Sequence, residues 1–542
     1  MKRILALLLA AATVMSLFSG CGREIDNSGY VPTGDAILME GQDPEDIMPE
    51  PEDTQELTLA YYPERSMNPL FGSDYTNRVL MSLMYQGLFA VDNKKNATPI
   101  LAGEYYVSGN SRNWVVYLDS RAKFSDGTPV TPQDVIATYE KAMENDYYKG
   151  RFFHLVNVGL SEDGNGILFQ MDTPYENLAL LLDIPIVKAS EVEAELPLGT
   201  GPYAFVTGLT GAHLQRVADW WCGSTKLPAT DLTIDLVEVS TPAEVRDAFQ
   251  FNGDKSVSVV CTNPMSDSFA EYSCDYELWE IESGYFMYLG CNILYSPFFD
   301  DGTLRTFLTY AIDRVTLAQD AYKGMVYPVT LPCSPTEVYY STTLASAYQY
   351  DSLKFINKMA SYRVPQKDGM DQQMRLLVNS DDSARVRIAR SIAATLTDLG
   401  LPTKTLECNG YTYREAVRAQ NFDLYLGMTR LSPTMDLTEY FRPWGELGWG
   451  GLAHETLYSM SLNALENSGN YYNLYKKLAE DGRIIPIMFG YYAVYAQRGL
   501  MPDLNPSRDN VFYYSLGKTM EGIKMDALPV VETEPQEDPE AA

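Results

Sequence analysis

Strand-like and helix-like patterns alternate along residues 57–525, and this alternation limits the folds open to the chain. Residues 57–61 alternate as a strand does, and residues 76–88 carry apolar side chains at helical spacing. Residues 114–118 form a second strand pattern. No short repeat recurs, so we expect mixed α/β lobes and not a solenoid. About 470 residues exceed what one hydrophobic core supports, which predicts two or three subdomains.

Local signals also set the expected ends of several elements. Thr131 precedes Pro132 and stands three residues before Asp134, a combination that predicts the start of a helix. Apolar residues between 389 and 399 mark one face of another helix, which we expect to end at Gly400.

Two further patterns lie in the second half of the chain. Residues 423–428 read as a buried strand. Residues 307–315 place apolar side chains at helical spacing, which predicts one helix with a single apolar face. The side chains of that face are Phe307, Leu308, Ala311, Ile312 and Val315.

The first twenty residues have the pattern of a lipoprotein signal peptide. Lys2 and Arg3 precede an apolar run over residues 4–14, and small residues then lead to Cys21. The run is shorter than the roughly 20 apolar residues of a membrane-spanning helix. We expect residues 1–20 to be removed and Cys21 to carry the lipid that anchors the chain on the extracytoplasmic face of the cell membrane. An ordinary secretory signal with an incidental cysteine is the alternative.

Both ends of the mature chain are acidic and poor in large apolar residues. Residues 22–56 carry eleven acidic residues against one arginine, and residues 526–542 carry six acidic residues and no base. Such segments cannot bury a core, so we expect 21–56 to be a disordered tether and 526–542 a disordered tail. The whole chain has a formal net charge of −31 and no basic cluster. We therefore expect no nucleic-acid partner.

The chain lacks the residue patterns of common hydrolases and metal enzymes. It has three histidines, and His454 lacks the second histidine that a zinc protease places four residues along a helix. Asp381 and Asp382 are adjacent, hence on different faces, and we expect them to cap the following helix. We expect neither catalysis nor a bound metal or other cofactor. Six cysteines remain after Cys21, and because their spacing fixes no pairing, disulfides and free thiols both stay open.

Several motifs, taken in their order along the chain, resemble one family. They are residues 99–102, 114–118 and 123–135, the Gly-Thr-Gly-Pro-Tyr turn at 199–203, the Trp-Trp-Cys-Gly element at 220–223 and the Tyr-Ala-Ile-Asp-Arg helix at 310–314. Over nearly all of 57–525 the chain is similar to the family 5 extracellular solute-binding proteins, which are the dipeptide, oligopeptide and nickel receptors of ABC importers. The resemblance implies an α/β, two-lobed periplasmic-binding-protein-like fold of type II with an extra subdomain. A ligand cleft between the lobes would close about a hinge.

The resemblance also implies a function and a division of the chain. The expected role is the substrate-binding component of an ABC importer, a monomer that delivers peptides or related small solutes to permease and ATPase subunits. The alternative is a non-transport sensor or chaperone-like binding protein of the same fold. The implied limits are 57–283 for lobe one with a subdomain at about 90–190, 284–488 for lobe two, 489–525 for the return to lobe one, and crossings near 283–289 and 484–489.

The resemblance places the ligand between two short segments. The predicted ligand-binding residues are Ser73, Asp74 and Tyr75 of lobe one and Met428, Thr429 and Arg430 of lobe two. The residues alone also allow a second interpretation. In it, Asp74 caps the helix that begins near residue 76, and Tyr75 packs on the surface.

One position departs from the pattern of the peptide-binding members. In those proteins the corresponding strand is followed by an aspartate that pairs with the free amine of the peptide, whereas here the matching positions hold Arg430 and Leu431. A buried ammonium without a carboxylate is costly, so we expect a preference for acidic or amine-blocked ligands, which the planar guanidinium fork suits. Two alternatives stay open. Asp436 reaches back into the site, or Arg430 pairs internally with an acid such as Asp423 or Glu439.

Overall fold

The fold is described from a computed structural model of the chain. The structure describes residues 57–71, 74–208, 211–223, 233–251, 256–266, 272–365, 373–501 and 504–512. The predicted signal peptide, tether and tail, together with Cys21 and Ser73, lie outside these ranges. Within the described ranges, no helix is long and apolar enough to cross a membrane.

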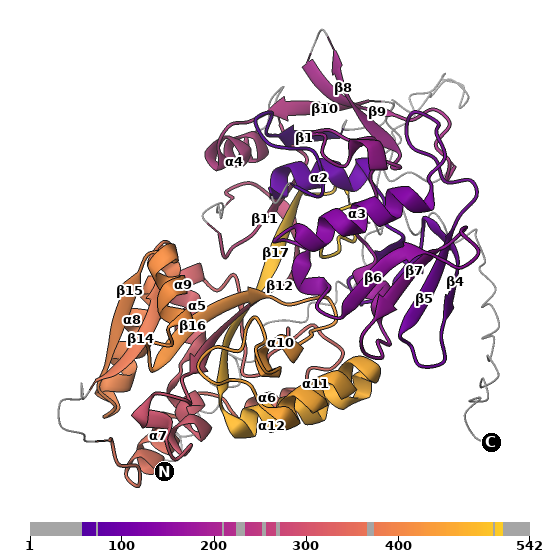
Figure 1. Cartoon of the computed structure of the whole chain (residues 1–542). Coiled ribbons are helices and arrows are strands. Elements are labelled where there is room, and N and C mark those ends of the chain that lie inside the picture. Colours follow the sequence, from indigo (N-terminus) through magenta and orange to yellow (C-terminus); the bar gives the residue numbers. More distant parts are fainter. Residues whose placement is uncertain are drawn as a thin grey trace, which may run out of the picture. The chain divides into compact units, whose positions relative to one another are not determined.

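An eleven-stranded sheet runs through the described part of the chain (Figure 1). Its order is β15 (Thr403–Cys408), β14 (Met374–Asn379), β16 (Leu424–Arg430), β12 (Tyr276–Cys291), β17 (Ile484–Gln497), β11 (Val259–Thr262), β1 (Thr58–Tyr61), β10 (Thr233–Glu238), β9 (Gly211–Arg216) and β8 (Tyr203–Gly208), with β13 (Tyr327–Pro328) paired to β17 off this path. β1 pairs in parallel with β10 and β11, and β14 pairs in parallel with β15 and β16. Parallel pairs need long crossover connections, and helices supply several of them.

Two long antiparallel strands, β12 and β17, carry the sheet from one end to the other. Their pairing shifts register between Glu282 and Phe286. On one side of the shift β17 pairs with β11, and on the other side β12 pairs with β16. The shift thus separates two groups of strands, and β12 and β17 cross between them. The predicted crossings near 283–289 and 484–489 fall within these two strands, while the limits of the lobes remain predictions.

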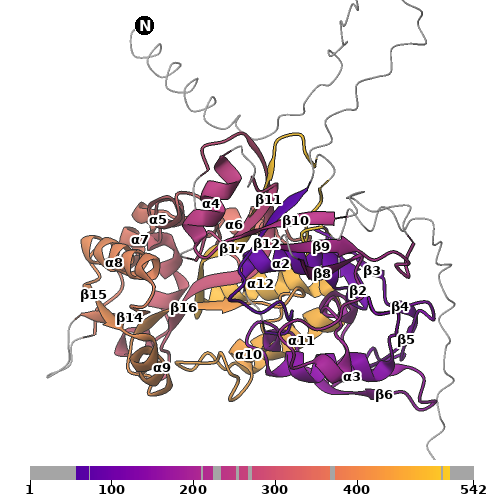
Figure 2. The same ribbon diagram turned by 90° about the horizontal axis from the view of Figure 1, so that it is seen from above.

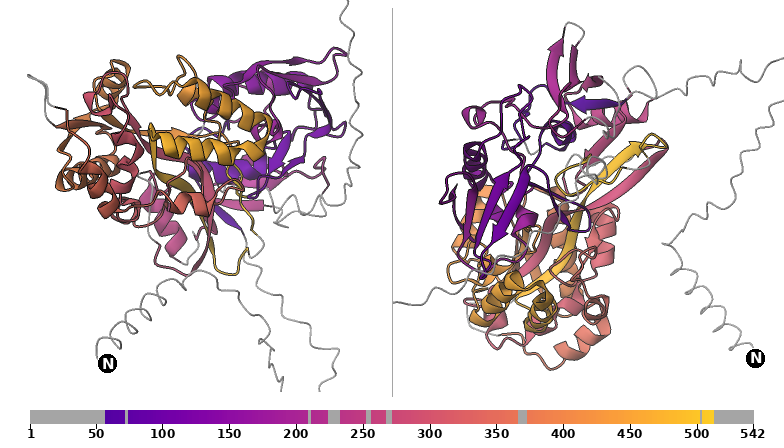
Figure 3. Two further views of the ribbon diagram at one scale, coloured as in Figure 1. Left: turned by 90° about the horizontal axis from the view of Figure 1, so that it is seen from below. Right: turned by 90° about the vertical axis from the view of Figure 1, so that its right-hand side faces the viewer.

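Helices pack on both groups of strands (Figures 2 and 3). α2 (Tyr75–Met84) contacts β1 and β11, and α4 (Pro242–Gln250) contacts β11. In the other group, α8 (Ser383–Asp398) and α9 (Gly410–Arg418) contact β14 and β15. The remaining helices of this group are α5 (Arg314–Tyr322), α6 (Thr342–Ser346), α7 (Ser352–Met359), α10 (Thr438–Phe441), α11 (Glu455–Glu466) and α12 (Tyr471–Asp481).

A separate antiparallel sheet lies within residues 90–190, the range predicted for a smaller subdomain. Its order is β4 (Ala102–Val107), β5 (Asn113–Leu118), β7 (Ile167–Met171) and β6 (Leu155–Leu160), and a further pair joins β2 (Phe89–Val91) to β3 (Ala97–Pro99). α3 (Pro132–Glu144) covers this sheet. Tyr139 of α3 meets the rings of Phe152 and Phe169 edge-on, which fixes the helix against the strands.

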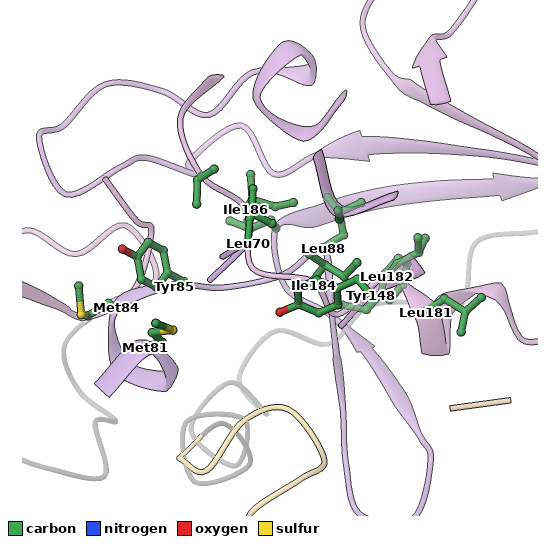
Figure 4. Packing of buried hydrophobic residues seen from close by; sticks show 14 of the residues in the cluster. Leu70, Met81, Met84, Tyr85, Leu88, Tyr148, Leu181, Leu182, Ile184 and Ile186 are labelled. Carbon is green, nitrogen blue, oxygen red and sulfur yellow. The ribbon is translucent and has the colours of Figure 1, made fainter. Parts of the chain in front are cut away.

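Buried apolar side chains form clusters that divide in the same way as the strands. The largest cluster draws mainly on residues between Leu57 and Leu214, and Figure 4 shows the part in which Met81 and Tyr85 of the α2 region pack near Leu70 and Ile186. Two other clusters draw on residues between 265 and 489. Each group of strands therefore has its own core, as separate lobes require.

The local predictions for helix ends are confirmed except at Asp381, whose carboxylate accepts the backbone N–H of Gly410 and does not cap α8. Thr131 and Asp134 form a reciprocal capping box at the start of α3, with Pro132 as the first helical residue. The side chain of Asp382 caps α8, and Gly400 follows that helix with φ +90°. The strand predicted for 423–428 corresponds to β16.

The single helix predicted for residues 307–315 is wrong. The stretch holds a 3-10 turn at Leu308–Ala311, and α5 starts only at Arg314. Asp313 causes the break, because its side chain accepts a backbone N–H of the next turn and caps a new helix. Val315 is therefore 68% exposed and does not face the core.

The cysteines left open by their spacing form no disulfide among the described residues. They are Cys222, Cys261, Cys274, Cys291, Cys333 and Cys408. Burial raises the pKa of the Cys261 thiol to about 12, so this thiol stays protonated at neutral pH. Stability in the described ranges therefore rests on packing and polar contacts.

Candidate functional site

Three tyrosines meet where β12 and β17 cross between the two groups of strands. Tyr75 is the first residue of α2, and the side chain of Asp74 caps that helix. The Tyr75 hydroxyl lies 3.4 Å from that of Tyr285 on β12 and accepts a hydrogen bond of 3.4 Å from the amide of Asn263. Its ring centroid lies 4.9 Å from that of Tyr492 on β17. The helix start, the crossing strands and the loop after β11 thus share one aromatic site.

Arg430, the last residue of β16, is engaged by the chain itself. Its Nε donates to the carbonyl of Ser283 and its Nη1 to the carbonyl of Tyr147, both at 3.1 Å. Its Nη2 donates to the Tyr147 hydroxyl and to the Asp509 carboxylate, both at 2.9 Å. The guanidinium carbons of Arg430 and Arg78 each lie 3.8 Å from the centroid of the Tyr147 ring. All three guanidinium nitrogens of Arg430 therefore have partners inside the protein.

The Asp509 carboxylate is the centre of a buried ionic network. One oxygen accepts from the Tyr147 hydroxyl at 2.6 Å and from Arg430, and the other accepts from Arg151. Arg151 also donates to Asp183. Burial opposes the ionisation of Asp509, yet Arg430 and Arg151 hold its pKa well below the ordinary value. For Asp183, burial outweighs Arg151 and raises the pKa.

A second part of this network adjoins the hinge strand β12. Lys95 lies 2.9 Å from Glu282 and 3.1 Å from Glu337. Arg508 lies 3.5 Å from the same Glu282 oxygen and donates through Nη2 to the carbonyl of Leu431. Burial raises the pKa of Glu337, whereas Arg508 and Lys95 overcome the burial of Glu282 and lower its pKa.

A small pocket lies between the network and the tyrosines. It is lined by α2, the loop after α3, β17 and residues 507–511. The side chains that bear on its chemistry are Tyr75, Arg78, Tyr147, Tyr492, Arg508 and Asp509. The lining is therefore aromatic and rich in arginine.

Further polar contacts join residues on either side of the crossing strands. His154 lies 2.8 Å from the hydroxyl of Thr438 and 2.8 Å from Asp172, and Asp436 lies 3.5 Å from the same ring. Tyr175 bonds the Thr434 hydroxyl at 2.6 Å. The turn after β16 is thus held against the smaller sheet. Asp436 is occupied there, so it does not reach back to Arg430.

The described members of the predicted site fall into different surroundings. Asp74 caps α2, as the second interpretation held, and Tyr75 lines the pocket instead of packing on the surface. Arg430 lies in the ionic network. Met428 and Thr429 are half-buried on β16 outside the pocket lining. The role of these residues in binding a ligand stays a prediction.

Arg430 has an acid partner that the sequence did not suggest. Asp423 and Glu439 each pair with another arginine, whereas Asp509 pairs with Arg430 from 79 positions away. Tyr147 was missed as well, because it stands 283 positions from Arg430. Separations of this size leave no local signal in a single sequence.

This fold and site define a class of protein. The chain has two groups of strands with separate cores, and two strands cross between them. Aromatic and charged side chains lie at the crossing. This is the architecture of two-lobed binding proteins that close about a hinge. The family model for bacterial extracellular solute-binding proteins, family 5 (middle region), matches residues 96–450. The chain belongs to this family.

Curated relatives and solved structures agree with this placement. The glutathione-binding protein GsiB of Escherichia coli strain K12 is 24% identical over 312 residues, which cover 53% of this chain. The match spans only 57% of the length of GsiB. Two similar structures are the substrate-binding protein CtaP of Listeria monocytogenes (TM-score 0.64, 16% identity, 84% of this chain and 97% of CtaP) and the oligopeptide-binding protein AppA of Bacillus subtilis with a nonapeptide (TM-score 0.57, 19% identity, 84% and 96%). These likenesses confirm the predicted two-lobed α/β fold.

Proposed function

We propose that this chain is the extracytoplasmic solute-binding component of an ABC importer, which captures a peptide or related small solute between its lobes. The observation that carries the proposal is the position of the aromatic and ionic site. Tyr75, Tyr285 and Arg430 come from both sides of the β12 crossing and meet there. A solute bound at this place would contact both lobes and would favour their closure.

The chemistry of the site favours recognition over catalysis. Its groups are tyrosine rings, guanidinium groups and carboxylates that contact one another. Such groups orient a ligand without bond making, and turnover would need a nucleophile with a general base beside it. The family and the structural neighbours are binding proteins, and we infer that this chain releases its solute unchanged.

The anchor is proposed from the sequence. Cys21 after the apolar run is the residue for a lipid, and two acyl chains suffice for stable membrane attachment where one is marginal. The acidic segment 21–56 would hold the folded part away from the membrane surface. The chain would act there as a monomer that hands its solute to a permease and an ATPase.

Ligand-induced closure tests the proposal. The full chain, purified in detergent, is titrated with a library of short peptides and peptide-like solutes while small-angle scattering and intrinsic fluorescence are recorded. At least one solute should reduce the radius of gyration and change the fluorescence. Tyr75→Ala should weaken that response, whereas Tyr411→Ala, at a tyrosine that is 71% exposed on α9, should leave it intact. No response to any solute would refute the assignment.

Import and sensing are separated by a second experiment. If the chain serves an importer, deletion of its gene abolishes uptake of the labelled solute that gave closure. If uptake continues while a transcriptional response to the solute is lost, the sensor alternative replaces the importer.

A further inference from the structure

We propose that the pocket beside Arg508 is an anion subsite, which receives a carboxylate or another small anionic group of the solute. The proposal rests on the proposed function and gives it a ligand class. It also moves the anion-binding role that the sequence suggested for Arg430 to a different arginine.

Arg508 is buried without a full set of acceptors. Its side chain is 8% exposed, and its Nη2 donates to the carbonyl of Leu431. Its Nη1 lies 3.5 Å from a Glu282 oxygen that already accepts from Lys95 at 2.9 Å. Its Nε has no acceptor among the described residues. A buried charged donor without an acceptor is energetically unfavourable. A group that supplies acceptor oxygen atoms would remove this cost and would therefore bind there favourably.

The acid that lines this pocket accepts hydrogen bonds from other residues. Asp509 lines the pocket, but one of its oxygens is taken by Tyr147 and Arg430 and the other by Arg151. Asp509 thus accepts from residues other than Arg508, and the Nε of Arg508 has no acceptor in the described part of the chain.

The charge of the connected network also favours an anionic ligand group. Its cations are Arg78, Lys95, Arg151, Arg430 and Arg508, and its acids are Asp183, Glu282, Glu337 and Asp509. Burial raises the pKa of both Asp183 and Glu337, which weakens their negative contribution further. A solute ammonium would enter a site with excess positive charge, whereas an anion would neutralise it.

The lining of the subsite suits an anionic group. Arg508 contributes charged N–H donors, and Tyr75, Tyr147 and Tyr492 line the same pocket. Arg508 reaches this place because β12 has a glycine there. A Cβ on Gly284 would lie 1.8 Å from Nη2 of Arg508. The subsite therefore adjoins the hinge strand, where occupancy can influence closure.

Isolated anions test the subsite without knowledge of the solute. Thermal unfolding of the full chain is followed during titration with sodium acetate, sodium phosphate and neutral acetamide at constant ionic strength. Acetate or phosphate should raise the melting temperature saturably, acetamide should not, and the better anion tells a carboxylate site from a phosphate site. Arg508→Gln should weaken this binding by roughly tenfold or more, since one charge-assisted hydrogen bond is lost. Arg390→Gln, at an exposed arginine paired with Glu407, should bind the anion as the unchanged protein does.

A second readout uses the unchanged protein, because Arg508→Gln also removes the bond to Leu431. Crystals of the full chain are soaked in bromide, and anomalous diffraction should place an ion within the pocket at Arg508. Saturable stabilisation lost in Arg508→Gln, or bromide in the pocket, supports the proposal. Absence of both overturns it and means that Glu282 alone neutralises Arg508. Neither result depends on solute-induced closure, so failure of the subsite is distinguishable from failure of the binding function.

Discussion

Asp509→Asn is the change expected to disturb the site most for the smallest change in shape. The Asp509 side chain is 5% exposed and accepts hydrogen bonds from Arg151, Arg430 and Tyr147. Asparagine keeps the volume but removes the negative charge, and it turns one acceptor into a donor that faces guanidinium groups. Two buried cations would then lack their shared counter-charge.

The expected cost follows from what that carboxylate holds together. Removing one partner of a buried ion pair typically costs about 3–5 kcal/mol, because the remaining charge stays buried without compensation. Stabilities of native proteins lie at about 5–15 kcal/mol, so the loss is a large fraction of the total. We expect a clear decrease in the urea midpoint of Asp509→Asn at pH 7. Circular dichroism and fluorescence should both be recorded, since a two-lobed chain need not unfold in one step.

Asp183→Asn is the matched control, because Asp183 bonds the same Arg151. Burial raises the pKa of Asp183, so its charge is poorly stabilised in the folded protein. Its loss should cost no more than about 1 kcal/mol, the size of an ordinary hydrogen bond. If Asp183→Asn destabilises the protein as much as Asp509→Asn at pH 7, the assignment of charge within the network is wrong.

The two aspartates also predict opposite responses to pH. The pKa of Asp509 is lower in the folded protein than its unfolded value of about 3.9, so its contribution is complete above that pH and is lost as the pH falls through the folded value. The stability gap between the unchanged protein and Asp509→Asn should therefore narrow below about pH 4. Asp183 has a raised pKa, so its contribution is present below about pH 4 and declines as the pH rises.

Three further predictions concern the hinge, the anchor and the ligand. Gly284→Ala should lower the stability of the fold several times as much as Gly127→Ala. Both glycines have φ near +80°, but only at Gly284 would a Cβ overlap Arg508. Melting temperatures of the two variants measure the difference. Cys21→Ser should move the chain from the membrane fraction to the soluble fraction, and retention in the membrane would contradict the lipid anchor. Calorimetry should find no preference for a short peptide with a free amine over its acetylated form, because Arg430 stands where an amine-pairing acid is expected; a strong preference would show that the anchor is elsewhere.

The parts of the fold that the sequence predicted depend on contacts between near neighbours. The capping box of Thr131 and Asp134 spans three residues, and Gly400 ends a helix by its own backbone preference. The prediction of one helix over 307–315 was wrong for an equally local reason. It followed the spacing of apolar residues, whereas in the structure Asp313 caps a new helix. Periodicity and capping compete locally, and a side chain that binds the backbone decides the outcome.

The sequence predicted two residues of the site, Tyr75 and Arg430, but not the contacts that hold Arg430 there. Arg430 was singled out because an acid was expected there, but its partners are 283 and 79 positions away, and pairs so distant leave no pattern in one sequence. The network itself explains the departure. Asp509 is already paired with two arginines, so it is not free to pair with a solute amine, and the Nε of Arg508 has no acceptor among the described residues. On this proposal, the solute itself supplies the acceptor for Arg508. The negative charge of the ligand then follows from the pairing of Asp509 with Arg151 and Arg430.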